Sequence, residues 1–160
     1  AAITISALDL KAAGFDPKLG VEMHLLGKRG KRRVDFLEGL QKQMQFFSSF
    51  SDKLQEDFLV YTIEKGKEVN KMMPIMVRHW KRGDTRGLER LMRKAASDKR
   101  FKPIEKVLLD DRNKSMSKTI EGMLTKSKEV HFIVVGAGHL VGKKSILSEL
   151  AKRGYKLRQL

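Results

Sequence analysis

The residue pattern best suited to chemistry is Gly136-Ala137-Gly138-His139, which follows the apolar run at residues 132–135. Two glycines at the end of a predicted strand let the backbone approach a ligand closely. A histidine there can ligate a metal or transfer a proton, because its pKa lies near neutrality. The alternative is a glycine-rich turn that carries an exposed histidine without a role.

The same glycines allow a second interpretation, a dinucleotide-binding turn, because Gly136, Gly138 and Gly142 form a GxGxxxG pattern. That motif requires an acidic residue about 20 positions later, at the end of the next strand. The next predicted strand, at residues 155–160, is basic. The sequence therefore favours a metal or proton-transfer site over a nucleotide site.

Three polar residues lie on an apolar helix face or at the end of an apolar strand. Arg112 and Asn113 interrupt the apolar stripe of a helix predicted near residues 110–127. A core-facing amide needs a partner, and a guanidinium offers a planar fork for a carboxylate or an oxyanion. The alternative is a structural pair that ties this helix to the next strand. Glu38 ends a predicted strand at residues 34–37, where a carboxylate can ligate a metal or act as a base, although one acid in such a place is common.

Composition limits the class of protein. The 160 residues are 41% hydrophobic and 33% charged, which is typical of one folded domain. The sequence has no cysteine, which excludes disulfides and thiolate metal sites. No apolar run approaches the about 18 residues of a membrane span, and no signal peptide is recognisable. Because the chain begins without methionine, we expect a fragment or a mature product.

A net charge of +15 favours association with anions such as nucleic acid, anionic lipid or acidic proteins. The densest basic cluster consists of Lys28, Arg29, Lys31, Arg32 and Arg33. No aromatic residue is interleaved with it, so a sequence-reading nucleic-acid surface is disfavoured. We expect an exposed loop whose anion binding is weak, nonspecific and sensitive to salt.

The elements that must position these residues are mostly helical. Capping and apolar spacing predict a largely buried helix over residues 17–27, then a series of helices between residues 40 and 127. Apolar β-rich runs predict three short strands, at residues 34–37, 130–135 and 155–160. We expect the first two strands to share a sheet, because both must be buried in one core. The predicted fold class is α/β, α+β-like, helix-rich with a small mixed sheet.

Four segments resemble, in order and spacing, the C-terminal half of the TraB/GumN family, which includes the Tiki metalloproteases. They are GVEMHLL (residues 20–26), VDFLEGLQKQ (34–43), LLDDRNKSM (108–116) and HFIVVGAGHLVGKKSILSELAKRGYKL (131–157). The resemblance implies a fold similar to the erythromycin-esterase and ChaN-like group. It implies that residues 1–160 are a single domain, the C-terminal portion of a TraB/GumN-like domain whose N-terminal part is missing.

The family has two Gly-x-x-His motifs, a glutamate after a strand and an Arg-Asn pair. The matching residues here are Gly136 and His139, Glu38, and Arg112 with Asn113. The resemblance implies a peptidase site for a divalent metal (Mn, Co or Zn), in which His139 and Glu38 ligate the metal or activate water and Arg112 stabilises an oxyanion. The first Gly-x-x-His motif is absent from this chain, and position 22 is glutamate where the family usually has aspartate.

We expect Glu38, Arg112, Asn113 and His139 to converge on one cleft that is short of ligands, because a catalytic zinc site uses three protein ligands. Metal affinity would be weak unless a second chain or an upstream segment adds a histidine. The leading interpretation is a metal-dependent hydrolase acting on a peptide or protein substrate, inactive if truncated. The alternative is a noncatalytic binding or scaffold module whose basic surface associates with anionic partners.

Overall fold

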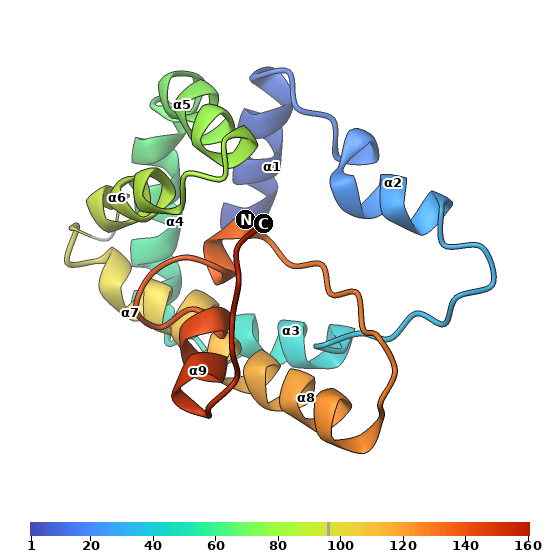
Figure 1. Cartoon of the computed structure of the whole chain (residues 1–160). Coiled ribbons are helices and arrows are strands. Elements are labelled where there is room, and N and C mark those ends of the chain that lie inside the picture. The colour runs from blue at the N-terminus through green and yellow to red at the C-terminus, as the bar shows by residue number, and fades with distance from the viewer. Residues whose placement is uncertain (96) are drawn as a thin grey trace.

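The computed structural model describes residues 1–95 and 97–160, and only the backbone of Leu40, Phe47 and Ala95. Within these residues the chain is a set of helices joined by turns and extended segments, without a β-strand (Figure 1). The α-helices are α1 (Ala2–Ala12), α2 (Val21–Gly27), α3 (Leu40–Ser48), α4 (Asp52–Gly66), α5 (Val69–Lys81), α6 (Thr85–Ala95), α7 (Phe101–Glu105), α8 (Arg112–Lys126) and α9 (Ile146–Lys152). Three shorter helical turns are η1 (Pro17–Leu19), η2 (Lys106–Asp111) and η3 (Ala137–His139).

Side-chain caps start several helices where the sequence predicts them. Asp16 accepts a hydrogen bond from the backbone N–H of Lys18 and so caps η1. Ser51 accepts one from the backbone N–H of Leu54 and caps α4, which ends at Gly66. These caps satisfy backbone donors that the first turn of a helix leaves free.

One continuous helical run leads from α7 through η2 into α8. The η2 turn is π-helical, so its backbone is wound more widely than the α-helices on either side. Turns of this kind are rare and occur frequently at functional sites. Here the π turn directly precedes Arg112 and Asn113, the first two residues of α8.

The core nearest these residues joins α8 to α9. It consists of four buried side chains: Met116, Ile120, Ile146 and Leu150. Partly buried side chains from the extended segments pack against it: Leu37, Ile133, Val135 and Tyr155. The α8–α9 core therefore anchors the segments that lead into the predicted site residues Glu38 and His139.

Shortening one side chain tests this core. Ile146 is 2% exposed, so Ile146→Val is expected to lower the free energy of unfolding by about 0.5–1.5 kcal/mol. The matched control is Ile3→Val in α1, where the side chain is 52% exposed and a negligible change is expected. Urea unfolding measures both variants, and an equal loss at the two positions would contradict the packing of α9 on α8.

The predicted mixed sheet is wrong. No backbone ladder joins residues 34–37, 130–135 or 155–160 to another segment within the described residues, and none of these three segments is a strand. A β-rich run favours extended backbone, but a strand also needs a neighbour to pair with. The described part of the chain offers no such neighbour, so the α+β-like prediction is corrected to a helical domain with extended connections.

The predicted burial of the helix over residues 17–27 is also wrong. Gly20 is extended and separates η1 from α2, and neither element has a buried residue. Leu19, Met23 and Leu26 are 83%, 55% and 44% exposed. The apolar side chains of this segment fall on more than one face, so their burial requires neighbours on several sides, whereas α2 packs mainly on η1.

The basic loop at residues 28–33 is exposed along its whole length, as predicted. Arg33 pairs with Asp35 at 2.9 Å, and the other four cations of the loop form no ion pair within the described residues. Anion binding by this loop stays a prediction. In the described ranges, no helix is both long and apolar enough to cross a membrane.

The α5–α6 hairpin contains a glycine with a steric role. His79 Nδ1 lies 2.7 Å from Asp84 Oδ2, and Asp84 Oδ1 accepts a hydrogen bond from Gly87 N at 2.8 Å. A Cβ atom at Gly87 would collide with both side chains. Gly87→Ala is therefore expected to destabilise the domain by about 1–3 kcal/mol, although alanine is the better helix former.

The control is Gly122→Ala in α8, where an added Cβ meets nothing within 4 Å. That substitution should stabilise the domain by up to about 1 kcal/mol, because alanine has the higher helix propensity. Chemical denaturation of the two variants measures both changes in the free energy of unfolding. A gain in stability at Gly87 would show that the His79–Asp84 contact does not constrain this position.

Candidate functional site

The four predicted site residues come from three parts of the chain. Glu38 lies in the bend just before α3, Arg112 and Asn113 begin α8, and His139 ends η3. Arg112 bonds to Glu38, and Asn113 bonds to His139. Because Arg112 and Asn113 are adjacent, the four residues form one connected set of contacts at the start of α8.

Glu38 and Arg112 form a buried ion pair. The Glu38 side chain is 3% exposed and that of Arg112 is 21% exposed. Arg112 Nε and Nη2 donate to the same carboxylate oxygen, Glu38 Oε2, at 2.9 and 2.7 Å. The other oxygen, Glu38 Oε1, is buried and has no hydrogen-bond partner within the described residues. A buried carboxylate oxygen without a partner is costly, and its presence calls for an explanation such as an ion or a water.

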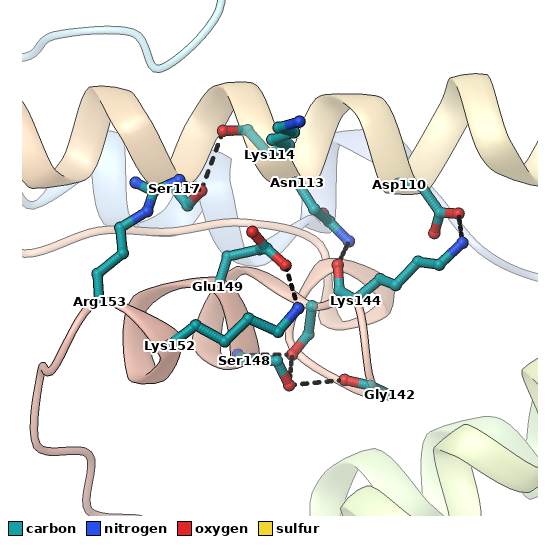
Figure 2. A network of polar contacts seen from close by, with 11 residues as sticks. Asp110, Asn113, Lys114, Ser117, Gly142, Lys144, Ser148, Glu149, Lys152 and Arg153 are labelled. Atoms are coloured by element: carbon teal, nitrogen blue, oxygen red, sulfur yellow. Dashed lines mark hydrogen bonds and ion pairs between the residues drawn. The ribbon is translucent and has the colours of Figure 1, made fainter.

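Asn113 fixes the tautomer of His139. The amide nitrogen of Asn113 donates to the backbone carbonyl of Lys144 at 2.9 Å, and Figure 2 shows it reaching from α8 to the loop before α9. The amide oxygen of Asn113 therefore faces His139 Nδ1, at 2.6 Å, and accepts its proton. This network assigns the proton to Nδ1 and leaves a lone pair on His139 Nε2, the state required of a metal ligand or a base.

The charge state of His139 follows from its surroundings. Burial lowers the pKa of His139 below its ordinary value, and the positive charge of Arg112 lowers it further. The negative charge of Glu38 acts in the opposite direction and raises the same pKa, with the smallest effect of the three. His139 is therefore neutral at pH 7, which keeps its Nε2 lone pair available.

A cavity of about 330 Å³ lies beside this cluster. It is lined in part by Asn113 and Leu109 of the π–α run, Met92 of α6, and Gly138. A Cβ atom at Gly138 would lie 3.4 Å from the terminal methyl of Met92, so a larger residue would narrow this cavity. An added Cβ would make only ordinary van der Waals contact here, so the packing on α6 does not itself require glycine at position 138.

His139 and Glu38 have the chemical character of divalent-metal ligands, and they would supply two of the ligands of such a metal. His139 Nε2 and Glu38 Oε1 are nitrogen and oxygen donors of the type that Zn, Mn and Co take. No group of three or more His, Asp or Glu residues among residues 1–95 and 97–160 is arranged to hold a metal ion. Arg112 also places a positive charge next to one of the two donors. A complete site would therefore need a further ligand.

Sequence reasoning did not identify two residues that support the site. The backbone carbonyl of Lys144 holds Asn113, and the Lys144 ammonium pairs with Asp110 of the π turn. Ser145, 2% exposed, caps α9 by accepting a hydrogen bond from the backbone N–H of Ser148. A serine just before an apolar helical run is a recognised N-cap signal, so Ser145 could have been predicted. The Lys144 contact is made by backbone and has no sequence signal.

The chain is similar to a known protein over part of its length and to a family model over nearly all of it. A metalloprotease TIKI homolog from Amphimedon queenslandica is 40% identical over 50 residues, which are 31% of this chain and 10% of that protein. The aligned part thus spans about a tenth of the relative's length. No solved structure matches the chain significantly. The model of the TraB/PrgY/gumN family matches residues 1–159, so the chain belongs to that family.

Proposed function

We propose that this chain carries part of the active site of a metal-dependent hydrolase that cleaves peptide bonds. The observation that carries the proposal is the buried, unpartnered Glu38 Oε1 in a cluster that also holds a neutral imidazole with a free Nε2. A carboxylate oxygen and an imidazole nitrogen in one cluster are two of the three protein ligands that a hydrolytic zinc site uses. Family membership and the metalloprotease relative support the same class of reaction.

Each residue has a distinct role in this proposal. His139 Nε2 and Glu38 Oε1 are metal ligands, and Asn113 is a positioning residue that orients the His139 ring. Arg112 holds Glu38 through Nε and Nη2, while its Nη1 makes only a long 3.4 Å contact with Leu108 O. That nitrogen is the donor we assign to the oxyanion of the tetrahedral intermediate.

A bound divalent metal would polarise the carbonyl of the substrate peptide bond and lower the pKa of a bound water. The protein holds the donors in a partly buried cluster, which strengthens the interactions between charged groups. We expect weak affinity for Mn, Co or Zn from this chain alone, because two ligands and a neighbouring guanidinium bind a cation poorly. A third donor from a second chain or from elsewhere in the protein would raise the affinity.

The experiment is a peptidase assay on the protein that contains this chain. Quenched fluorescent peptides are incubated with Mn²⁺, Co²⁺ or Zn²⁺ and separately with EDTA. Cleavage that requires one of these metals, stops with EDTA and returns on adding the metal back supports the proposal. Cleavage that persists in EDTA contradicts the metal dependence. A protein that binds polyanions and cleaves no peptide under any condition contradicts the hydrolase and favours the noncatalytic module.

A further inference from the structure

The hairpin formed by α5 and α6 carries a dense group of cations at one edge of the molecule (Figure 1). Residues 69–94 contain eight lysines and arginines and only two carboxylates, Asp84 and Glu89. All eight cations are exposed. The one ion pair that the described residues of this hairpin form joins His79 to Asp84, so it neutralises none of the eight.

The exposed side of α6 is almost entirely cationic. Among its described side chains, Thr85 is exposed, and the others that are exposed are all cations: Arg86, Arg90, Arg93 and Lys94. Their spacing of three and four residues places them on one side of the helix. Leu88, on the opposite side, is buried. The sequence of α6 therefore separates a packed side from a side that offers positive charge to the solvent.

The neighbouring helix α5 combines cations with apolar side chains. Lys71, Ile75 and Arg78 recur at a spacing of four and then three residues, so they share one side of α5, and Ile75 is 40% exposed. Trp80, near the end of the helix, is 49% exposed. Arg82 follows the helix directly.

Packing against the rest of a larger domain does not account for this cationic surface. Burying an unpaired cation is costly, and packed cations are normally paired. Two arginines elsewhere in the chain illustrate this, since Arg112 pairs with Glu38 and Arg153 pairs with Glu121. The unpaired cations of α5 and α6 are thus suited to solvent and to an anionic partner from outside the domain.

The hairpin holds its cations in fixed relative positions. The two helices pack on each other, and His79 at the end of α5 contacts Asp84 just before α6 at 2.7 Å. The Gln159 side chain donates to the carbonyl of Gly83, in the turn between the helices, at 2.9 Å. The basic loop at residues 28–33, by contrast, is not helical. A preorganised array of cations loses less conformational entropy on binding than a loop does.

We propose that the exposed cations of α5 and α6 bind the surface of a membrane that contains anionic phospholipids. Guanidinium groups pair well with phosphate and carboxylate oxygens, which are the charged groups of such lipids. Clusters of about four to eight lysines and arginines on an amphipathic helix are typical of this binding. Exposed Ile75 and Trp80 suit the boundary between headgroups and acyl chains.

A nucleic acid is the less suitable polyanion. Its bases are read by polar side chains or stacked on aromatic ones, and the exposed side of α6 offers only Thr85 for this among its described side chains. Membrane binding through this hairpin requires neither a metal nor hydrolysis, so it is independent of the proposed function.

The test is cosedimentation of the protein that contains this chain with vesicles of equal parts phosphatidylcholine and phosphatidylserine, and with vesicles of phosphatidylcholine alone. The test variant is the double substitution Arg86→Gln and Arg90→Gln, which keeps good helix formers on α6. The control is Lys28→Gln with Arg29→Gln in the basic loop, which lowers the net charge by the same amount. All four side chains are exposed and form no ion pair within the described residues, so both variants should fold, as circular dichroism would show.

We expect the protein to bind the phosphatidylserine vesicles, with an affinity that falls as salt is added, and not the vesicles of phosphatidylcholine alone. The α6 variant should bind roughly 30-fold more weakly, and the loop variant should stay within roughly threefold of the parent. Equal losses in the two variants would show that only net charge matters and would overturn the proposal. So would absence of vesicle binding, or binding of duplex DNA through Arg86 and Arg90 by a protein that leaves the vesicles unbound.

Discussion

Replacing His139 by glutamine should lower metal-dependent peptidase activity by more than about 100-fold, since even the loss of a residue that only orients a metal ligand typically costs about 10–100-fold. Glutamine keeps a polar side chain of similar length, so it can still contact Asn113, but it offers no imidazole nitrogen to a metal. His139 is partly buried beside Arg112 and Glu38, so the loss reports on this cluster.

The control for this variant is His24→Gln, because the His24 side chain lies exposed on α2 and makes no hydrogen bond or ion pair within the described residues. Its activity should match that of the parent protein. Steady-state rates at saturating metal compare the two variants, and circular dichroism confirms that both are folded. Full activity in His139→Gln would remove His139 from the proposed site.

Replacing Arg112 by methionine should lower the free energy of unfolding by about 3–5 kcal/mol, because it leaves the buried Glu38 carboxylate without its partner. Methionine keeps much of the side-chain volume, so the loss reports the uncompensated charge more than a cavity. Adding Glu38→Gln should recover part of the loss, since the second substitution removes that charge. Urea unfolding at neutral pH measures all three proteins.

The matched control is Lys53→Met, which breaks an ion pair on the exposed face of α4. Lys53 Nζ lies 2.7 Å from Asp57 Oδ1, and the Lys53 side chain is 75% exposed. Water screens such a pair, so no measurable loss of stability is expected. Similar losses in the Arg112 and Lys53 variants would show that burial of the Glu38–Arg112 pair has no energetic consequence.

The local features of this fold could be predicted from sequence, because they depend on neighbours in the chain. Asp16 and Ser51 cap helices since their side chains reach backbone donors two or three residues ahead. The apolar run at residues 130–135 predicted extended backbone, and Ile133 and Val135 of this run pack against the core. It could not show whether a second strand lies beside this one, and this is why the predicted sheet is wrong.

The sequence was sufficient to select the residues of the candidate site. It was not sufficient to predict which of these residues contact one another. Glu38, Arg112, Asn113 and His139 are each recognisable from their position at the end of an element or on an apolar stripe. The π turn before Arg112 and the contact of Asn113 with the Lys144 carbonyl are backbone features without a residue signature. Arg112 contacts Glu38 and Asn113 contacts His139, because consecutive residues of a helix point in different directions.

The most direct test of the proposed metal site is a Zn²⁺ titration followed by NMR of the histidine ring nitrogens. Before zinc is added, His139 should be the tautomer with its proton on Nδ1, as the hydrogen bond to Asn113 requires. Zinc should then bind weakly and shift His139 Nε2 ahead of the nitrogens of His24, His79 and His131. A proton on His139 Nε2, or tight zinc binding that leaves His139 unchanged, would contradict the proposed site.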